Sequence, residues 1–304
     1  MGPTAAGKTG LAMELARAVP AEIISVDSAL VYREMDIGTA KPSPALRREV
    51  PHHLLDLLDP AEAYSAGRFR RDALAAMDEV RGRGRVPILA GGTMLYFRAL
   101  QRGLAELPEA DPVLRAELDE AGARNGWPAL HAELARVDPL AAARIQPGDS
   151  QRIQRALEVW RLSGTPLSEL QAAGARPLEG WNFLKLGLAR ASRPDLHKAI
   201  ERRFHAMMAA GFLAEVACLY GRGDLHPGLP SIRAVGYRQL WAHVAGECDL
   251  ASAVEDAITA TRRLAKRQMT WLRAEPDLRW LASPGEGRAA ALAWLGENAR
   301  GSGP

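Results

Sequence analysis

The feature that most constrains this chain is a phosphate-loop pattern, Gly-x-x-x-x-Gly-Lys-Thr, at residues 2–9. Its glycines, Gly2 and Gly7, permit backbone angles that let consecutive N–H groups curl around a phosphate. Lys8 adds a mobile positive charge, and Thr9 is the residue whose hydroxyl such loops offer to Mg²⁺. A helix predicted over residues 8–19 points its positive end at the same anion. The predicted diphosphate- or nucleotide-binding residues are Gly2, Pro3, Thr4, Ala5, Ala6, Gly7, Lys8 and Thr9.

The position of this loop in the chain is unusual. Such a loop normally follows a buried β-strand, whereas only Met1 precedes this one. We therefore expect the first strand of the sheet to be missing. The predicted helix still needs a sheet beneath it, because Leu11, Leu15 and Val19 give it an apolar face.

Short apolar runs alternate with helical patterns after the loop, which predicts an α/β fold with a parallel sheet flanked by helices. Residues 22–26 and 86–90 read as buried strands, and residues 50–56 as a further short strand. Asp27 follows the first of these, and Gly91-Gly92-Thr93 follows the second. Ligands bind beyond the carboxyl ends of parallel strands, so Asp27 and Thr93 are candidate site residues. Capping of the next helix is the alternative role for Thr93.

The strand–helix alternation stops near residue 111, and the chain up to about residue 176 has only helical patterns. It resumes with a predicted strand at 183–188 and ends in a long helix, 257–273, that has a basic face. We therefore expect a catalytic core made of residues 1–110 and 181–304, with a helical insertion domain at 111–180.

Charge is distributed unevenly along the chain. Residues 1–180 carry 22 Lys and Arg against 24 Asp and Glu, whereas residues 181–304 carry 17 against 12. A basic half joined to a phosphate-binding half favours a polyanionic partner such as nucleic acid. A genome that prefers arginine codons is the alternative, but it does not explain the segregation.

Other features of the sequence favour a cytoplasmic protein. No apolar run has the length of a membrane span, and no signal peptide is recognisable, so we expect no membrane partner. The two cysteines, Cys218 and Cys248, have no metal-binding or redox spacing. A reducing, cytoplasmic location and a monomer are the resulting expectations.

Several longer motifs resemble the bacterial tRNA dimethylallyltransferase (tRNA isopentenyltransferase) family. They include Ser-Val-Asp-Ser-Ala-Leu at 25–30, Met-Asp-Ile-Gly-Thr-Ala-Lys-Pro at 35–42 and Gly-Gly-Thr-Met-Leu-Tyr at 91–96. Residues 2–9, 149–160, 229–237 and 264–273 also match, so that the resemblance covers almost the whole chain. The chain departs from the pattern at its N-terminus, where members of the family normally start earlier and supply the strand before the loop.

The resemblance implies a P-loop NTPase-like fold and transfer of a dimethylallyl group from dimethylallyl diphosphate to N6 of adenine 37 in tRNA, next to the anticodon. It implies Mg²⁺ as cofactor and the anticodon stem-loop of tRNA as partner. Carried over by resemblance, the tRNA-facing residues are Asp27, Ser28, Ala29, Leu30, Thr93, Arg115, Gln151, Arg152, Ile153, Gln154, Arg155, Ile232, Arg233, Ala234, Val235, Gly236, Tyr237, Lys266, Arg267 and Gln268.

The residues themselves suit this chemistry. Diphosphate would be the leaving group, and the loop amides, Lys8 and Mg²⁺ held by Thr9 would stabilise its developing charge. The adenine amine needs a proton acceptor, for which Asp27 is the candidate, while Thr93 could position the amine or a phosphate oxygen. A small-molecule kinase that uses ATP and a non-catalytic RNA-binding protein are the two alternatives.

Overall fold

The computed structural model describes residues 1–174 and 177–300, and its chain divides into two compact units. One unit joins Met1–Ala99 to the chain from Gly180 onward, and the other is Leu100–Glu179. The sequence placed these divisions at residues 110 and 180.

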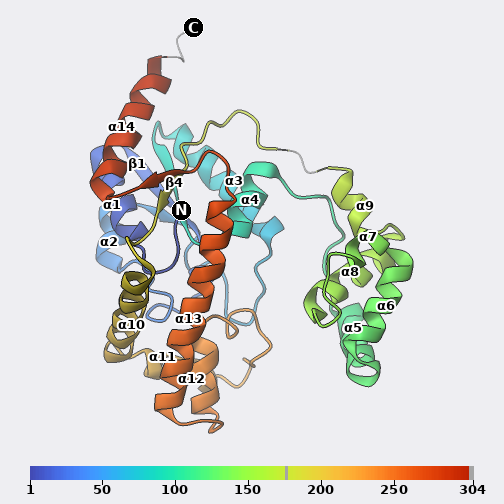
Figure 1. Ribbon diagram of the computed structural model, residues 1–304. Helices are drawn as coiled ribbons and strands as arrows, with labels where there is room; N and C mark the ends of the chain where they lie inside the picture. The colour runs from blue at the N-terminus through green and yellow to red at the C-terminus, as the bar shows by residue number, and fades with distance from the viewer. Residues whose placement is uncertain (175–176, 301–304) are drawn as a thin grey trace. The chain divides into compact units, whose positions relative to one another are not determined.

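The first unit carries all the strands of the described chain. Its elements are α1 (Lys8–Ala18), β1 (Ala21–Val26), α2 (Pro44–Glu49), β2 (His52–His53), α3 (Ala66–Gly82), β3 (Val86–Gly91), α4 (Met94–Arg102), β4 (Leu186–Leu188), α10 (Arg193–Ala209), α11 (Phe212–Gly221), α12 (Tyr237–Val244), α13 (Leu250–Arg273), β5 (Arg279–Leu281) and α14 (Pro284–Arg300). Figure 1 shows helices α1 and α14 beside the strands and the long α13 running away from them.

The strands form two parallel sheets. One has the order β2-β1-β3, and the other pairs β4 with β5. Because Ala21 pairs with Val86 and Val26 with Gly91, β1 and β3 end at the same edge of their sheet. Asp27 and Gly92 follow directly at that edge, as the sequence predicted.

No strand precedes α1 within residues 1–174 and 177–300. Met1 nevertheless pairs with β4, since its amino group donates to Leu186 O (2.7 Å) and Leu188 N donates to its carbonyl (2.9 Å). Helix α1 contacts both sheets. Leu11 packs against Leu188 and Leu281, whereas the neighbouring Ala12 and Met13 pack in a separate cluster that includes β1 and β3. Of the expected apolar face, Leu11 and Leu15 thus pack on the β4–β5 sheet, whereas the contacts to β1 and β3 come from Ala12 and Met13, which were not predicted.

A strand was predicted over residues 50–56, but only His52–His53 pairs with β1. Leu54 and Asp56 both adopt left-handed backbone angles (φ 61° and 55°), which extended chain does not contain. The local backbone therefore ends this strand after two residues. Helix α2, which begins after the Ser43 cap, and strand β5 were not predicted.

The largest apolar core of the first unit lies between helices α10, α11, α12 and α13. It includes Phe204, Phe212, Tyr237 and Ala257, together with Met35 from the segment after β1. This core supports the segments that line the site described below. In residues 1–174 and 177–300 no single helix is long and apolar enough to cross a membrane; α10 and α11 together pass that test of length and composition but are bent by 62°.

The second unit is entirely helical where the structure describes it. It contains α5 (Pro112–Asn125), α6 (Trp127–Val137), α7 (Pro139–Ala142), α8 (Ser150–Ser163) and α9 (Leu167–Ala172). Its own core contains Leu118, Leu134, Ile153 and Leu157, all fully buried. The sequence indicated a helical insertion over residues 111–180, and the structure has a unit over Leu100–Glu179 with a core of its own.

Candidate active site

The phosphate loop folds as its pattern predicts. Gly7 has φ 97°, a left-handed angle that favours glycine, and it directly precedes α1. No side chain of the described residues caps this helix, so its first amides are available to an anion. Lys8 Nζ donates to Pro3 O (2.8 Å) and so lies folded back along the loop, while the Thr9 side chain is exposed.

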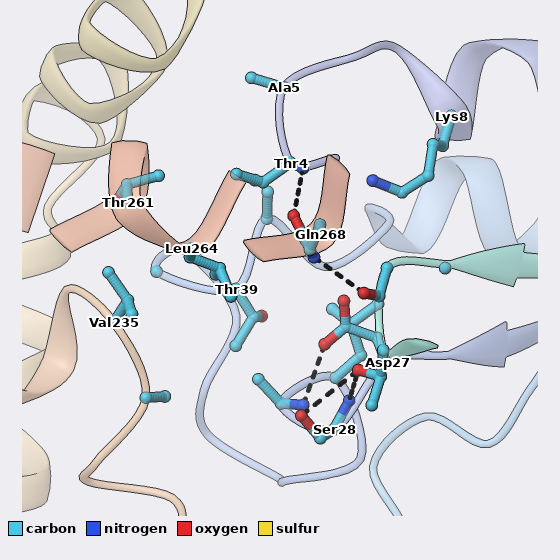
Figure 2. Close-up of a pocket in the computed structure, with 18 of the residues that line it drawn as sticks. Thr4, Ala5, Lys8, Asp27, Ser28, Thr39, Val235, Thr261, Leu264 and Gln268 are labelled. Carbon is cyan, nitrogen blue, oxygen red and sulfur yellow. Dashed lines mark hydrogen bonds between the residues drawn. The ribbon is translucent and has the colours of Figure 1, made fainter. Parts of the chain in front are cut away.

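A pocket of about 620 Å³ opens beside this loop and is bounded entirely by residues of the first unit. The loop contributes Thr4, Ala5, Lys8 and Thr9 to its wall. The rest of the wall comes from the segments after β1 and β3, residues 38–40, helix α10, the 230–237 segment and α13. Figure 2 shows Lys8 and Asp27 on one side of this space and Val235 and Leu264 on the other. The pocket therefore has a charged part and an apolar part.

Thr93 joins the ends of the two central strands. Its Oγ1 accepts a hydrogen bond from Ser28 N (3.1 Å) and donates one to Ser28 Oγ (3.4 Å), while its own N–H donates to Val26 O (3.2 Å). The side chain thus binds the neighbouring strand end rather than an amide of α4. Asp27 lies beside it, and its Oδ1 accepts from Ala29 N (3.0 Å). Both predicted residues line the pocket.

Two cations and one carboxylate share the charged part of the pocket. Burial lowers the pKa of Lys8 to about 8; the negative charge of Asp27 opposes this shift and the positive charge of Arg203 adds to it. Burial also lowers the pKa of Arg203, again opposed by Asp27. Arg203 lies on α10 and was not predicted from the sequence. It makes no hydrogen bond or ion pair to the described residues, so its guanidinium is available to an anionic ligand.

Helix α13 contributes both structure and charge to the site. Gln268 accepts from Thr4 N and donates to Gly92 O, each at 2.8 Å, and so ties the phosphate loop to the end of β3 (Figure 2). Arg267 and Trp271 line the pocket, and the Arg98 guanidinium lies 4.2 Å from the centre of the Trp271 ring. Lys266 is exposed but does not line the pocket. Two of the three predicted residues here, Arg267 and Gln268, thus reach the cavity.

Apart from Lys266, the predicted tRNA-facing residues of the first unit fall into two groups. Those that line the pocket are Asp27, Ser28, Ala29, Leu30, Thr93, Arg233, Ala234, Val235, Tyr237, Arg267 and Gln268. Ile232 and Gly236 are buried behind that surface, and the Ile232 side chain is fully enclosed. Ile232 and Gly236 therefore support the fold of the segment 230–237 and do not face the cavity.

Two of the predicted residues of the helical unit, Arg115 and Arg155, bind one buried carboxylate. Arg115 donates to both oxygens of Glu158 (2.8 and 3.0 Å), and Arg155 donates to Glu158 Oε2 (2.6 Å). Gln154 donates to Asp119, and Arg152 pairs with Asp149 at the start of α8. Gln151 is exposed beside them, whereas Ile153 belongs to the buried core of this unit.

The donor atoms near the loop suit a Mg²⁺ ion that is held mainly by a ligand's phosphates. In residues 1–174 and 177–300 no three His, Cys, Asp or Glu side chains gather as a metal site. The Thr9 hydroxyl and the Asp27 carboxylate do line the pocket next to the loop. Mg²⁺ commonly takes only one or two protein oxygens and completes its shell with phosphates and water, so this donor set fits.

A phosphate loop at the edge of a parallel sheet, with one carboxylate and several cations around one pocket, defines an enzyme site for a phosphorylated substrate. The chain belongs to the IPP transferase family, whose sequence model matches residues 30–275.

Named relatives agree over almost the whole chain. The tRNA dimethylallyltransferase of Bordetella petrii is 60% identical over 281 residues, 91% of this chain and 88% of that protein. The enzyme of the same name from Alkalilimnicola ehrlichii is 61% identical and covers 95% of this chain and 90% of its own length.

Solved structures give the same result. The tRNA isopentenylpyrophosphate transferase of Bacillus halodurans has a TM-score of 0.71 at 35% identity, with 98% of this chain and 96% of that chain covered. A eukaryotic dimethylallyltransferase acting on tRNA has a TM-score of 0.78 at 26% identity, over 92% of this chain and 72% of that chain. The predicted family and the P-loop NTPase-like fold are confirmed. The small-molecule kinase receives no support, and the family is one of prenyltransferases.

Proposed function

We propose that this chain transfers a dimethylallyl group from dimethylallyl diphosphate to N6 of adenine 37 in tRNA and releases diphosphate. The observation that carries the proposal is the meeting of the phosphate loop, Lys8 and Asp27 at one pocket. A kinase and a prenyltransferase both need the loop. Only the prenyltransferase explains why an apolar surface adjoins the phosphate site, and its named relatives share that activity.

The donor's diphosphate lies against the loop. The first amides of α1, the Lys8 ammonium and the Arg203 guanidinium stabilise negative charge on the diphosphate as the allylic C–O bond breaks. The Thr9 hydroxyl would hold Mg²⁺, which when bound would supply further neutralisation of the leaving group. The donor carbon is thereby made electrophilic without a covalent intermediate on the protein.

Asp27 acts as the base for the attacking amine. The lone pair of an adenine N6 amine is drawn into the ring, so attack requires a group that accepts the amine proton. The Asp27 carboxylate lines the pocket, and its Oδ1 is oriented by the Ala29 amide. Thr93, which follows β3, holds the end of β1 beside it through its hydrogen bond from Ser28 N. Its hydroxyl also lies on the pocket wall, where it positions the amine.

The tRNA binds mainly through cationic and polar groups. A base has to leave its stack to enter the pocket, and Arg233, Val235 and Arg267 line the space that would receive it. Exposed Lys266 on α13, with Arg115, Gln151, Arg152, Gln154 and Arg155 of the helical unit, adds contacts to the anticodon stem-loop. We propose that the enzyme acts as a monomer, because residues of the first unit alone bound the pocket, and that it acts in the cytoplasm, where its tRNA substrate is found.

A coupled assay tests this function against the kinase. Diphosphate release from dimethylallyl diphosphate should require tRNA that lacks the modification and should stop when that tRNA is exhausted. ATP with Mg²⁺ should not be consumed in the absence of tRNA. Steady ATP turnover without RNA, or tRNA binding with no diphosphate release, would contradict the proposal.

A further inference from the structure

The segment between residues 35 and 41 forms one wall of the pocket and is held more firmly than a loop usually is. Gly38, Thr39 and Ala40 line the cavity. The Glu215 side chain of α11 accepts hydrogen bonds from three consecutive amides: those of Asp36 (3.0 Å), Ile37 (2.7 Å) and Gly38 (3.1 Å). A single carboxylate thus satisfies the backbone of the whole turn.

Tyr237 ties this wall to a second one. Its hydroxyl donates to Glu215 Oε1 at 2.5 Å, and its ring is buried. Burial and the neighbouring Glu215 charge raise the pKa of Tyr237, so the phenol stays protonated and remains a donor. Tyr237 begins α12 directly after the segment that carries Ala234 and Val235. Glu215 therefore sets the distance between two lining segments that are far apart in the sequence.

The turn has no freedom to shift toward the protein interior. A Cβ on Gly38 would lie 2.1 Å from the Phe212 ring and 2.6 Å from the Tyr237 ring, so the backbone rests directly on both. Those rings stack edge to face with centroids 4.9 Å apart. At the far end, the Lys41 ammonium is buried and binds Tyr32 O, Asp36 and Asp56, each at 2.6 Å. The wall is therefore held by hydrogen bonds to Glu215 at one end and to Lys41 at the other, and it packs against the rings of Phe212 and Tyr237.

The face that this wall turns to the pocket is small and apolar. The Thr39 hydroxyl donates to Met35 O (2.7 Å), which leaves its methyl group as the part available to a ligand. Gly38 has no side chain, and Ala40 presents only a methyl. Thr39 and Leu264 both line the pocket, and Figure 2 draws both to the left of Lys8 and Asp27. Such a surface suits a short hydrocarbon and offers nothing to a diphosphate or to the polar edge of a base.

We infer that Glu215, through its hydrogen bonds to residues 36–38 and Tyr237, is a positioning residue that fixes the wall against which the prenyl chain of the donor lies, and so limits the length of chain accepted. The inference rests on the proposed function. It adds a determinant of donor specificity that lies outside the phosphate loop and the strand ends.

Two variants test this inference, with donor selectivity as the readout. Glu215→Gln replaces one of the two carboxylate oxygens, which accept hydrogen bonds from the backbone amides, by an NH₂ group. Tyr237→Phe removes only the hydroxyl and keeps the ring. Transfer to tRNA is measured with dimethylallyl and with geranyl diphosphate as donors. We expect each variant to lower the ratio of kcat/KM for the shorter donor over the longer one by about tenfold, the size of effect typical of pocket fit. Binding of tRNA should change by less than about twofold, because the RNA contacts remain.

Asp249→Ala is the matched control. Asp249 caps α13 through Ser252 N (2.8 Å) and does not line the pocket, so its loss should lower stability without moving the wall. If Glu215→Gln and Tyr237→Phe lose activity only in proportion to their stability, as this control does, and keep the wild-type ratio, the inference is wrong. A wild-type enzyme that accepts both donors equally would also overturn it. Failure of the wild-type protein to modify tRNA with either donor would instead contradict the proposed function.

Discussion

Three charged residues of the pocket, Lys8, Asp27 and Arg203, are positioned by different parts of the fold. Lys8 belongs to a loop whose geometry is local, and Asp27 directly follows a strand whose end faces ligands in any parallel sheet. Arg203 stands next to Arg202 in a long helix, and nothing local distinguishes the two. Packing of α10 turns Arg203 into the pocket and leaves Arg202 exposed. Prediction at the residue scale succeeded where backbone geometry fixes the role of a side chain.

The ionisation of Lys8 should be visible in donor binding. Its pKa is lowered to about 8 by burial, so the ammonium is charged below that pH and neutral above it. A diphosphate binds the charged form more tightly. Its affinity should therefore fall as the pH rises through about 8, by at most about tenfold per pH unit. Calorimetric titration with dimethylallyl diphosphate across this range measures the effect. In Lys8→Ala the affinity should be lower at every pH and the step should be gone; a step that persists would belong to another group.

Asp27 should matter for chemistry rather than for RNA binding. Asp27→Asn keeps an oxygen that can accept from the Ala29 amide but removes the basic carboxylate. We expect kcat to fall by about 10²–10⁴, the usual contribution of a general base. Affinity for tRNA, measured by filter binding, should stay within about twofold. Asp27→Ala should show the same loss, and turnover at the wild-type rate in either variant would remove Asp27 as the base.

At the scale of elements, long periodic helices were predicted well and short strands poorly. The helix predicted at 257–273 is the C-terminal part of α13, and its N-terminal extension follows from the Asp249 cap. Strands β2 and β4 were predicted too long, at 50–56 and 183–188, and β5 was not predicted. Each has only two or three residues, too few for a sequence pattern to set its bounds. The bridge that Gln268 makes between the loop and Gly92 could not be predicted either, because it joins residues 176 positions apart. Tertiary contacts fix these features.

Helix α13 should carry part of the electrostatic attraction to tRNA. Lys266 and Arg267 are both exposed and make no ion pair within the described residues. If each contacts one phosphate, Lys266→Ala and Arg267→Ala should each reduce the slope of log affinity against log salt by about 0.7–0.9. Titrations of tRNA at several salt concentrations give this slope. Arg48→Ala, which removes an exposed cation on α2 outside the pocket lining, is the matched control and should leave the slope unchanged.

At the scale of the whole molecule, two units with separate cores indicate separable stabilities. The sequence predicted a helical insertion from the loss of strand patterns. It also predicted the family, because the longer motifs are spread over nearly the whole chain. It did not reveal that α1 would contact both sheets, through Leu11 on one side and Met13 on the other. That arrangement depends on how the strands are divided between the two sheets, and no local sequence pattern indicates this division.

A mutation that leaves a cavity in the core of the helical unit should weaken RNA binding without affecting donor binding. Leu134 is fully buried in the core of this unit, and Leu134→Ala should destabilise it by about 2–5 kcal/mol. Hydrogen exchange should then speed up within residues 100–179 while the first unit keeps its protection. Affinity for tRNA should fall, whereas affinity for dimethylallyl diphosphate should not. Equal loss of protection in both units would show that they unfold together.

The most direct test is to measure the mass of the RNA before and after the reaction. The enzyme is incubated with unmodified tRNA, dimethylallyl diphosphate and Mg²⁺, and the digested RNA is analysed by mass spectrometry. Our account predicts the addition of one C₅H₈ group to the adenosine immediately 3′ of the anticodon, with one diphosphate released for each group transferred. RNA of unchanged mass from a folded enzyme that binds both substrates, or an added group on any other nucleoside, would contradict it.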